Sequence, residues 1–213
     1  MSDKPIAVVA GGAGFIGSFL CEALLKEGKR VICIDNFSTS HVRNIEPYLR
    51  HADFQFLRLD INEPIDLESF AELEPFKVKF SGVQEIYHLA VPTSIKHFDD
   101  YRIQTLLSSS IGTKNILDLA VKYKARVLLA SSSVVYGGRT KDVTVFQEDY
   151  RGMSIILLRV HVMTRVSGLP RLCFTRMRRR RGLSHVLLEF LELTDLVCHS
   201  LMGIRFRTSL CLH

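Results

Sequence analysis

An apolar run that passes through three spaced glycines into an amphipathic helix constrains this chain more than any other feature. Residues 6–10 are all apolar, which is typical of a parallel strand buried on both faces. The turn after this strand has the spacing Gly-x-x-Gly-x-x-Gly, at Gly11, Gly14 and Gly17. A helical pattern then runs from about residue 18 to 27 and ends at Gly28. We expect a second strand at residues 30–34, so the segment predicts a β-α-β unit.

The glycine turn has the chemistry of a phosphate-binding loop. Glycine lets the chain turn sharply and approach a pyrophosphate with no Cβ in the way. The start of the helix adds free N–H groups and a partial positive charge. Asp35 ends the second strand, where a carboxylate accepts hydrogen bonds from the adenosine ribose and repels a 2′-phosphate. We therefore predict that this unit binds NAD in preference to NADP.

The alternation of strand and helix patterns continues downstream. We expect further strands at residues 54–59, 85–89 and 127–131, and helices near 42–49, 67–73 and 101–123. Strands that alternate with helices predict the α/β class, with a doubly wound parallel sheet of the Rossmann type.

Five segments occur in an order and at spacings that are typical of one enzyme family. They are residues 11–18, 35–39, 59–61, 87–90 and 131–137. They resemble the motifs of extended short-chain dehydrogenases, in the group of NAD-dependent nucleotide-sugar epimerases, dehydratases and decarboxylases. The resemblance spans residues 5–152 and implies NAD as the cofactor and a UDP-sugar as the substrate. It is also compatible with a homodimer.

The resemblance assigns cofactor contacts position by position. The expected cofactor-binding residues are Gly11, Gly14, Phe15, Ile16, Gly17, Asp35, Asn36, Ser38, Thr39, Asp60, Ile61, Leu89 and Ala90. It places Asp60 and Ile61 beside the adenine, and Leu89 and Ala90 along the cofactor. The alternative for Asp60 is a strand-end cap. We assign His88 no catalytic role, because a core histidine would explain it equally well.

Ser132 matches the catalytic Ser/Thr position of the family, four residues before Tyr136. By resemblance, its hydroxyl would hydrogen-bond the sugar 4-oxygen while a tyrosinate removes the proton and NAD takes the hydride. The alternative is a serine-rich strand end that caps the next segment. Val134 departs from the family pattern, because related decarboxylases carry Glu there and valine cannot transfer a proton. This departure favours 4-epimerisation over decarboxylation.

The general base of the family is missing from the chain. It is a Tyr-x-x-x-Lys pair, in which the lysine lowers the pKa of the tyrosine. No tyrosine follows Tyr150 and no lysine follows Lys141. A substrate domain is not recognisable either, so we predict that the chain as written is inactive. The second hypothesis is a non-catalytic NAD-binding fragment or isoform.

The composition changes abruptly near residue 152. Residues 1–152 carry a net charge of −1, whereas residues 153–213 carry +7, with ten arginines and three acids. The second segment contains no Lys, Ala, Asn, Gln or Tyr. We therefore predict a truncated Rossmann domain at residues 1–152, followed by an unrelated tail at residues 153–213 that forms no domain.

A shift of reading frame would explain this tail. Degenerate codons for residues 160–168 can also be read one nucleotide earlier. The permitted products include Ala-Cys-Tyr-Asp-Glu-Gly-Lys-Arg, which contains the missing Tyr-x-x-x-Lys pair and is most like UDP-glucuronate decarboxylases. The same shift at residues 193–198 permits Thr-Tyr-Gly-Pro-Arg-Met, another family motif. We infer a frameshift close to residues 152–153, whether through sequencing error, pseudogene or isoform.

Several other classes of function are not supported. The arginine run at residues 178–181 could be a nuclear-localisation or nucleic-acid patch, or only a solvated charge run. Without interleaved aromatic residues we expect no nucleic-acid partner. No apolar run reaches the roughly 18 residues that span a bilayer, and the N-terminus has no signal-peptide pattern. The five cysteines lack metal-ligand spacing, so we expect no metal and a reducing, cytoplasmic location.

Overall fold

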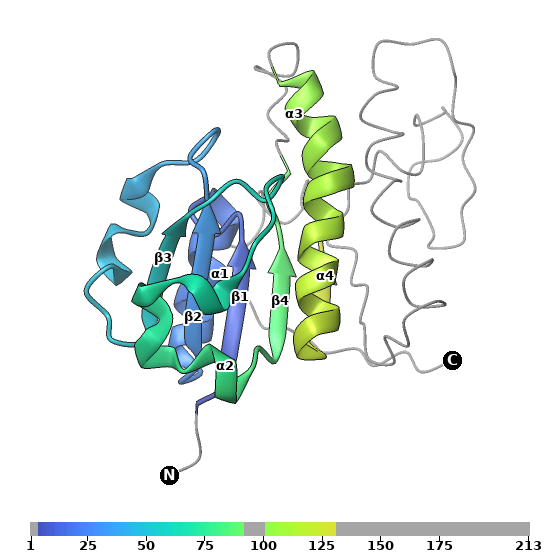
Figure 1. The fold of residues 1–213 in the computed structure, drawn as a ribbon. Coiled ribbons are helices and arrows are strands. Elements are labelled where there is room, and N and C mark those ends of the chain that lie inside the picture. The colour runs from blue at the N-terminus through green and yellow to red at the C-terminus, as the bar shows by residue number, and fades with distance from the viewer. Residues whose placement is uncertain (1–3, 92–100, 131–213) are drawn as a thin grey trace, which may run out of the picture.

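The computed structural model describes residues 4–91 and 101–130 (Figure 1). Five parallel strands form one sheet in the order β3-β2-β1-β4-β5. The strands are β1 (Ile6–Ala10), β2 (Arg30–Asp35), β3 (Phe54–Arg58), β4 (Glu85–His88) and β5 (Arg126–Leu129). From β1 the chain moves outward to β3, and it then crosses to β4 on the other side of β1. The predicted doubly wound parallel sheet is confirmed.

The helices agree with the sequence pattern only where they are long. They are α1 (Phe15–Lys26), α2 (Val78–Ser81), α3 (Arg102–Leu107) and α4 (Thr113–Tyr123). A π-helical segment, η6 (Ser108–Gly112), joins α3 to α4, so the helix predicted at 101–123 is one helical run.

The helices predicted near 42–49 and 67–73 are not α-helices. Their residues form the short 3-10 segments η1 (Val42–Asn44), η2 (Glu46–Tyr48), η3 (Leu67–Ser69) and η4 (Ala71–Phe76). Pro47 lies in η2 and Pro75 in η4. Proline lacks the N–H for an α-helical hydrogen bond, and its ring clashes with the carbonyl four residues earlier.

The two faces of the sheet carry separate cores. On one face, Ile6, Val8, Ile32 and Ile34 pack with residues of α4, among them Ile116 and Ala120. On the other face, Ala7, Val9, Val31 and Cys33 pack with Cys21 and Leu24 of α1. Figure 1 shows α1 behind the sheet and α4 in front of it. The successive side chains of β1 thus alternate between two cores, which explains why the whole strand is apolar.

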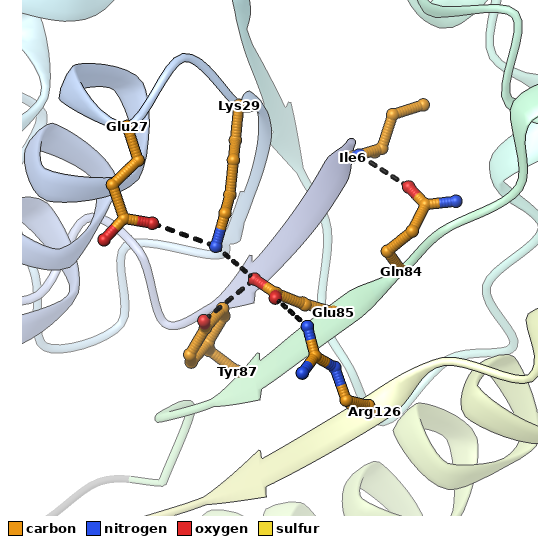
Figure 2. A network of polar contacts seen from close by, with 7 residues as sticks. All are labelled: Ile6, Glu27, Lys29, Gln84, Glu85, Tyr87 and Arg126. Carbon is orange, nitrogen blue, oxygen red and sulfur yellow. Dashed lines mark hydrogen bonds and ion pairs between the residues drawn. The ribbon is translucent and has the colours of Figure 1, made fainter. Parts of the chain in front are cut away.

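A polar network ties the amino-terminal edge of the sheet together (Figure 2). The Glu85 carboxylate at the start of β4 accepts from Lys29 Nζ at 2.6 Å, Tyr87 Oη at 3.0 Å and Arg126 at 2.5 Å. Lys29 also pairs with Glu27 at 3.0 Å. Burial by itself raises the pKa of Glu85, but the hydrogen bond and charge of Lys29 hold the pKa below its ordinary value. The network joins β4 to β5 and to the turn before β2.

The opposite edge of the sheet, at the top of Figure 1, is formed by the carboxyl ends of the strands. The glycine turn after β1 and the loops after β2, β3 and β4 all begin there. Open α/β sheets bind ligands in the crevice outside these strand ends, where the strand order reverses. Within residues 4–91 and 101–130, no helix has the length and hydropathy to cross a membrane.

Candidate functional site

The glycine turn is wedged between β2 and β4. Gly11 has φ of +82°, and its N–H donates to the Ile34 carbonyl at 2.8 Å. A Cβ at this position would lie 2.7 Å from the carbonyl carbon of Leu89, closer than two such atoms approach. Both the positive φ and this contact therefore require glycine at position 11.

The helix that follows begins in contact with the same turn. A Cβ on Gly17 would lie 2.1 Å from the Gly11 carbonyl oxygen and 2.7 Å from Gly12 Cα. Helix α1 has Gly14 as its N-cap, with no side-chain cap hydrogen bond and no acidic residue in its first turn. The first-turn N–H groups have no acceptor within the helix, so they can be donated to an anion such as a pyrophosphate.

Asp35 links the β2 loop to the glycine turn. Its Oδ2 accepts from the Ala13 N–H at 3.0 Å, and its Oδ1 accepts from the Phe37 N–H at 2.9 Å and Ser40 Oγ at 2.7 Å. A carboxylate has about four acceptor positions. One therefore remains for a ribose hydroxyl, and the three protein bonds fix its direction.

Asp60 lies at the neighbouring corner of the site. Its Oδ1 accepts from the Asn62 N–H at 2.9 Å, which is the local turn bond expected of a strand-end cap. Its Oδ2 accepts from Asn36 Nδ2 at 3.2 Å, so the β2 and β3 loops are joined across the site. The cap interpretation and a place in the site are therefore compatible.

These elements surround a pocket of about 620 Å³, part of it continuous with solvent. Ten of the predicted cofactor residues line it: Gly11, Gly14, Asp35, Asn36, Ser38, Thr39, Asp60, Ile61, Leu89 and Ala90. Four separate loops or turns contribute these residues, which only the tertiary fold brings together.

Phe15, Ile16 and Gly17 are not in the lining of this pocket. The Phe15 side chain is 63% exposed and meets Phe19 edge to face, with ring centroids 5.3 Å apart. The backbone N–H groups of these three residues lie in the first turn of α1, where they can be donated to a ligand. Ser132 lies outside the described residues, as do Val134 and the tail, so their roles remain predictions.

Four polar residues of the pocket wall were not anticipated from the sequence. Ser40 and Asn62 extend the predicted β2 and β3 loop segments, and Gln104 and Ser108 come from a separate part of the chain. Gln104 of α3 and Ser108 of η6 face the pocket from the side opposite the β2 loop. Their i, i+4 spacing places them on one helix face, and this was the available signal. Which face turns toward the pocket depends on how α3 packs, which the spacing does not reveal.

His88 is a core residue rather than a pocket residue. It is 1% exposed, and burial lowers its pKa to about 4, so the ring is neutral near pH 7. Its Nε2 lies 3.1 Å from Thr113 Oγ1, whose own hydrogen goes to the Ser108 carbonyl. Nε2 is therefore the protonated nitrogen that donates to Thr113. Among the described residues, no group of three or more His, Cys, Asp or Glu could hold a metal ion.

Residues 7–154 match the model of the NAD dependent epimerase/dehydratase family. The chain is 39% identical over 150 residues to UDP-glucuronic acid decarboxylase 1 of Danio rerio, covering 70% of this chain and 32% of that protein. It is 40% identical over 130 residues to UDP-glucuronic acid decarboxylase 4 of Arabidopsis thaliana, covering 61% and 26%. The chain thus spans about a third or less of the length of these relatives.

Solved structures show the same fold at lower identity. A dTDP-glucose 4,6-dehydratase from Bacillus anthracis, crystallised with NAD, superimposes with a TM-score of 0.66 at 22% identity, covering 86% of this chain and 53% of that chain. A UDP-glucose 4-epimerase from Thermotoga maritima, crystallised with UDP-glucose, also gives 0.66, at 23% identity, with 86% and 54% covered.

Proposed function

The chain belongs to the NAD dependent epimerase/dehydratase family, and we propose that its pocket binds NAD for the modification of a UDP-linked sugar. The observation that carries this proposal is the meeting of Gly11, Gly14 and Asp35 in one pocket at the strand ends. The glycine turn is suited to the pyrophosphate, and Asp35 is suited to the ribose of the adenosine half. The B. anthracis relative was crystallised with NAD, which supports this choice of cofactor.

Selectivity for NAD over NADP follows from the surroundings of Asp35. Asp35 is 9% exposed and its carboxylate is held in place by three hydrogen bonds, so it cannot turn away from a 2′-phosphate. Titration of the full chain with each cofactor tests the proposal. We expect tighter binding of NAD, and Asp35→Ala should weaken it by about 1–3 kcal/mol.

Asp66→Ala is the matched control for Asp35→Ala, because Asp66 is exposed and pairs with Lys122 away from the pocket lining. Equal or tighter binding of NADP by the unmodified chain would contradict the proposal.

The substrate is the less constrained part of the proposal. The relatives named above are UDP-glucuronic acid decarboxylases, and one structural neighbour was crystallised with UDP-glucose. When bound, NAD supplies a reversible hydride acceptor for C4 of the sugar. The described residues hold and orient the cofactor, and Ser132 would orient the 4-oxygen of the sugar. Decarboxylation and 4-epimerisation remain alternatives, because Val134 lacks the carboxylate expected of a decarboxylase.

A second candidate is a non-catalytic NAD-binding chain. The family match ends at residue 154, beside the change in composition near residues 152–153. This coincidence supports our proposal of a frameshift there, which separates the Tyr-x-x-x-Lys base from the domain at residues 1–152.

Two chains test this candidate: the one described here and one with the frame restored by one nucleotide near codon 153. Both are assayed with UDP-glucuronate and UDP-hexoses in the presence of NAD. We expect turnover only from the restored chain. Turnover by the 213-residue chain would disprove the inactive assignment, and a silent restored chain would count against the frameshift.

A further inference from the structure

A hydrogen bond joins the two sides of the pocket at one point. The Tyr101 hydroxyl donates to the backbone carbonyl of Ser38 at 3.2 Å. Ser38 belongs to the loop after β2, and Tyr101 is the N-cap residue of α3, 63 positions later. We propose that this contact, the Tyr101–Ser38 bridge, is a closure over the adenosine half of the cofactor, and that Tyr101 slows cofactor release. The inference rests on the proposed binding of NAD.

The helix side of the bridge belongs to the pocket wall. Tyr101, Gln104 and Ser108 are spaced i, i+3 and i+7, so they share one helix face. Gln104 and Ser108 line the pocket. The backbone position of Tyr101 is fixed by the start of α3, because the Thr105 N–H donates to the Tyr101 carbonyl at 2.8 Å. The phenol is therefore carried by the same face, at the end of the wall where α3 begins.

The loop side is held in place before any ligand binds. The Ser38 N–H donates to Asn36 Oδ1 at 2.9 Å, and Asn36 is in turn bonded to Asp60. Phe37 adopts φ of +60°, a left-handed conformation that non-glycine residues rarely take. Two contacts hold Phe37 in this conformation. Its N–H donates to the Asp35 carboxylate, and its ring centroid lies 5.0 Å from that of Phe56. The Ser38 carbonyl is thus presented by a fixed loop.

The position of the bridge identifies which half of the cofactor it affects. Ser38 is three residues beyond Asp35, the expected ribose contact, and Asp35 Oδ2 bonds the Ala13 N–H of the glycine turn that is expected at the pyrophosphate. Ser38 belongs to the loop that follows the carboxyl end of β2, and Tyr101 bonds its carbonyl from the start of α3. An adenosine seated at Asp35 would lie beneath the bridge, which would have to open before the nucleotide leaves.

The matching variant is Tyr101→Phe, which removes the hydroxyl and keeps the ring. Loss of one hydrogen bond of ordinary net strength predicts release about three- to tenfold faster. Release of NADH from the full chain is followed by stopped-flow fluorescence, and the dissociation constants of NAD and ADP-ribose are measured by calorimetry. Because the bridge also forms in the ligand-free chain, its loss should speed entry as well as release. We therefore expect the two dissociation constants to change less than release does. Any change should be the same for NAD and ADP-ribose, because ADP-ribose contains the adenosine half and lacks the nicotinamide.

Tyr123→Phe is the control, since that hydroxyl bonds Glu68 and Tyr123 does not line the pocket. It should leave all three quantities unchanged. Unaltered NADH release in Tyr101→Phe would overturn the proposal. So would a change in NAD binding without a matching change for ADP-ribose.

Hydrogen exchange separates this proposal from the proposal of NAD binding itself. In the ligand-free chain, Tyr101→Phe should speed exchange of the amides at residues 36–40, because their loop loses its attachment to α3. Faster exchange in a chain that binds no NAD would refute the cofactor proposals and leave only the structural contact. Unchanged exchange together with unchanged release would refute the bridge while NAD binding stands.

Discussion

Replacing Gly17 by alanine should abolish most cofactor affinity in a chain that still folds. The new Cβ would lie 2.1 Å from the Gly11 carbonyl oxygen, whereas real Cβ atoms essentially never approach within 3.0 Å. The turn and the first turn of α1 must therefore separate by at least 0.9 Å. The turn cannot yield easily, because Gly11 is bonded to the Ile34 carbonyl and packs on Leu89.

The magnitude follows from this displacement. Hydrogen bonds weaken steeply beyond about 3.2 Å, so a shift of nearly 1 Å removes a bond from the helix N–H groups to the pyrophosphate. One such bond to a charged group contributes about 1.5–3 kcal/mol, which corresponds to a loss of roughly one to two orders of magnitude in NAD affinity. The overpacking itself should lower the free energy of unfolding by about 1–3 kcal/mol.

The assay is calorimetric titration with NAD, alongside urea unfolding of the same protein. Gly28→Ala is the matched control, because Gly28 also has a positive φ of +77° but a Cβ there would have no neighbour within 4 Å. It should lower stability by about 1 kcal/mol and leave NAD affinity unchanged. A folded Gly17→Ala chain that binds NAD as tightly as the unmodified chain would refute the role assigned to this helix start.

Three further predictions concern stability and domain structure. Burial lowers the pKa of His88 from 6.5 to about 4, so the contribution of its neutral ring to the free energy of unfolding is complete above pH 6.5 and is lost as the pH falls. Urea unfolding should therefore show a free energy of unfolding about 2 kcal/mol lower at pH 5 than at pH 7. This pH dependence should disappear in His88→Leu and persist in His41→Gln. Glu85→Gln should lower the free energy of unfolding by about 2 kcal/mol, since Lys29, with its side chain 17% exposed, loses a charged partner. As a control, Asp118→Asn in the exposed pair with Lys114 should change the free energy of unfolding by less than about 1 kcal/mol. Equal effects of Glu85→Gln and Asp118→Asn would refute the importance of the network around Glu85. Limited proteolysis should cut soon after Gly152 and leave a resistant N-terminal core, and a resistant fragment from residues 153–213 would contradict the absence of a second domain.

The sequence by itself determined the features that depend on neighbouring residues. The strand, glycine turn and helix between residues 6 and 27 follow from local apolar patterns and from backbone conformations that only glycine adopts. Asp35 could be assigned to the pocket because the end of a parallel strand has a fixed place beside the glycine turn. The same local patterns failed at residues 42–49, where Pro47 prevents the regular hydrogen bonds that the apolar spacing suggested.

Only the tertiary structure decided which distant segments complete the site. The helical segment that carries Tyr101, Gln104 and Ser108 follows β4 in the sequence. Its spacing does not reveal that Tyr101 would bond Ser38 or that the other two residues would line the pocket. Burial of His88 and the joining of Lys29 to Glu85 likewise depend on strands that pair across 56 or more positions. Such contacts form because the two sheet faces must be covered and buried polar groups need partners. Those requirements apply to the whole packed domain, so no local window of the sequence contains them.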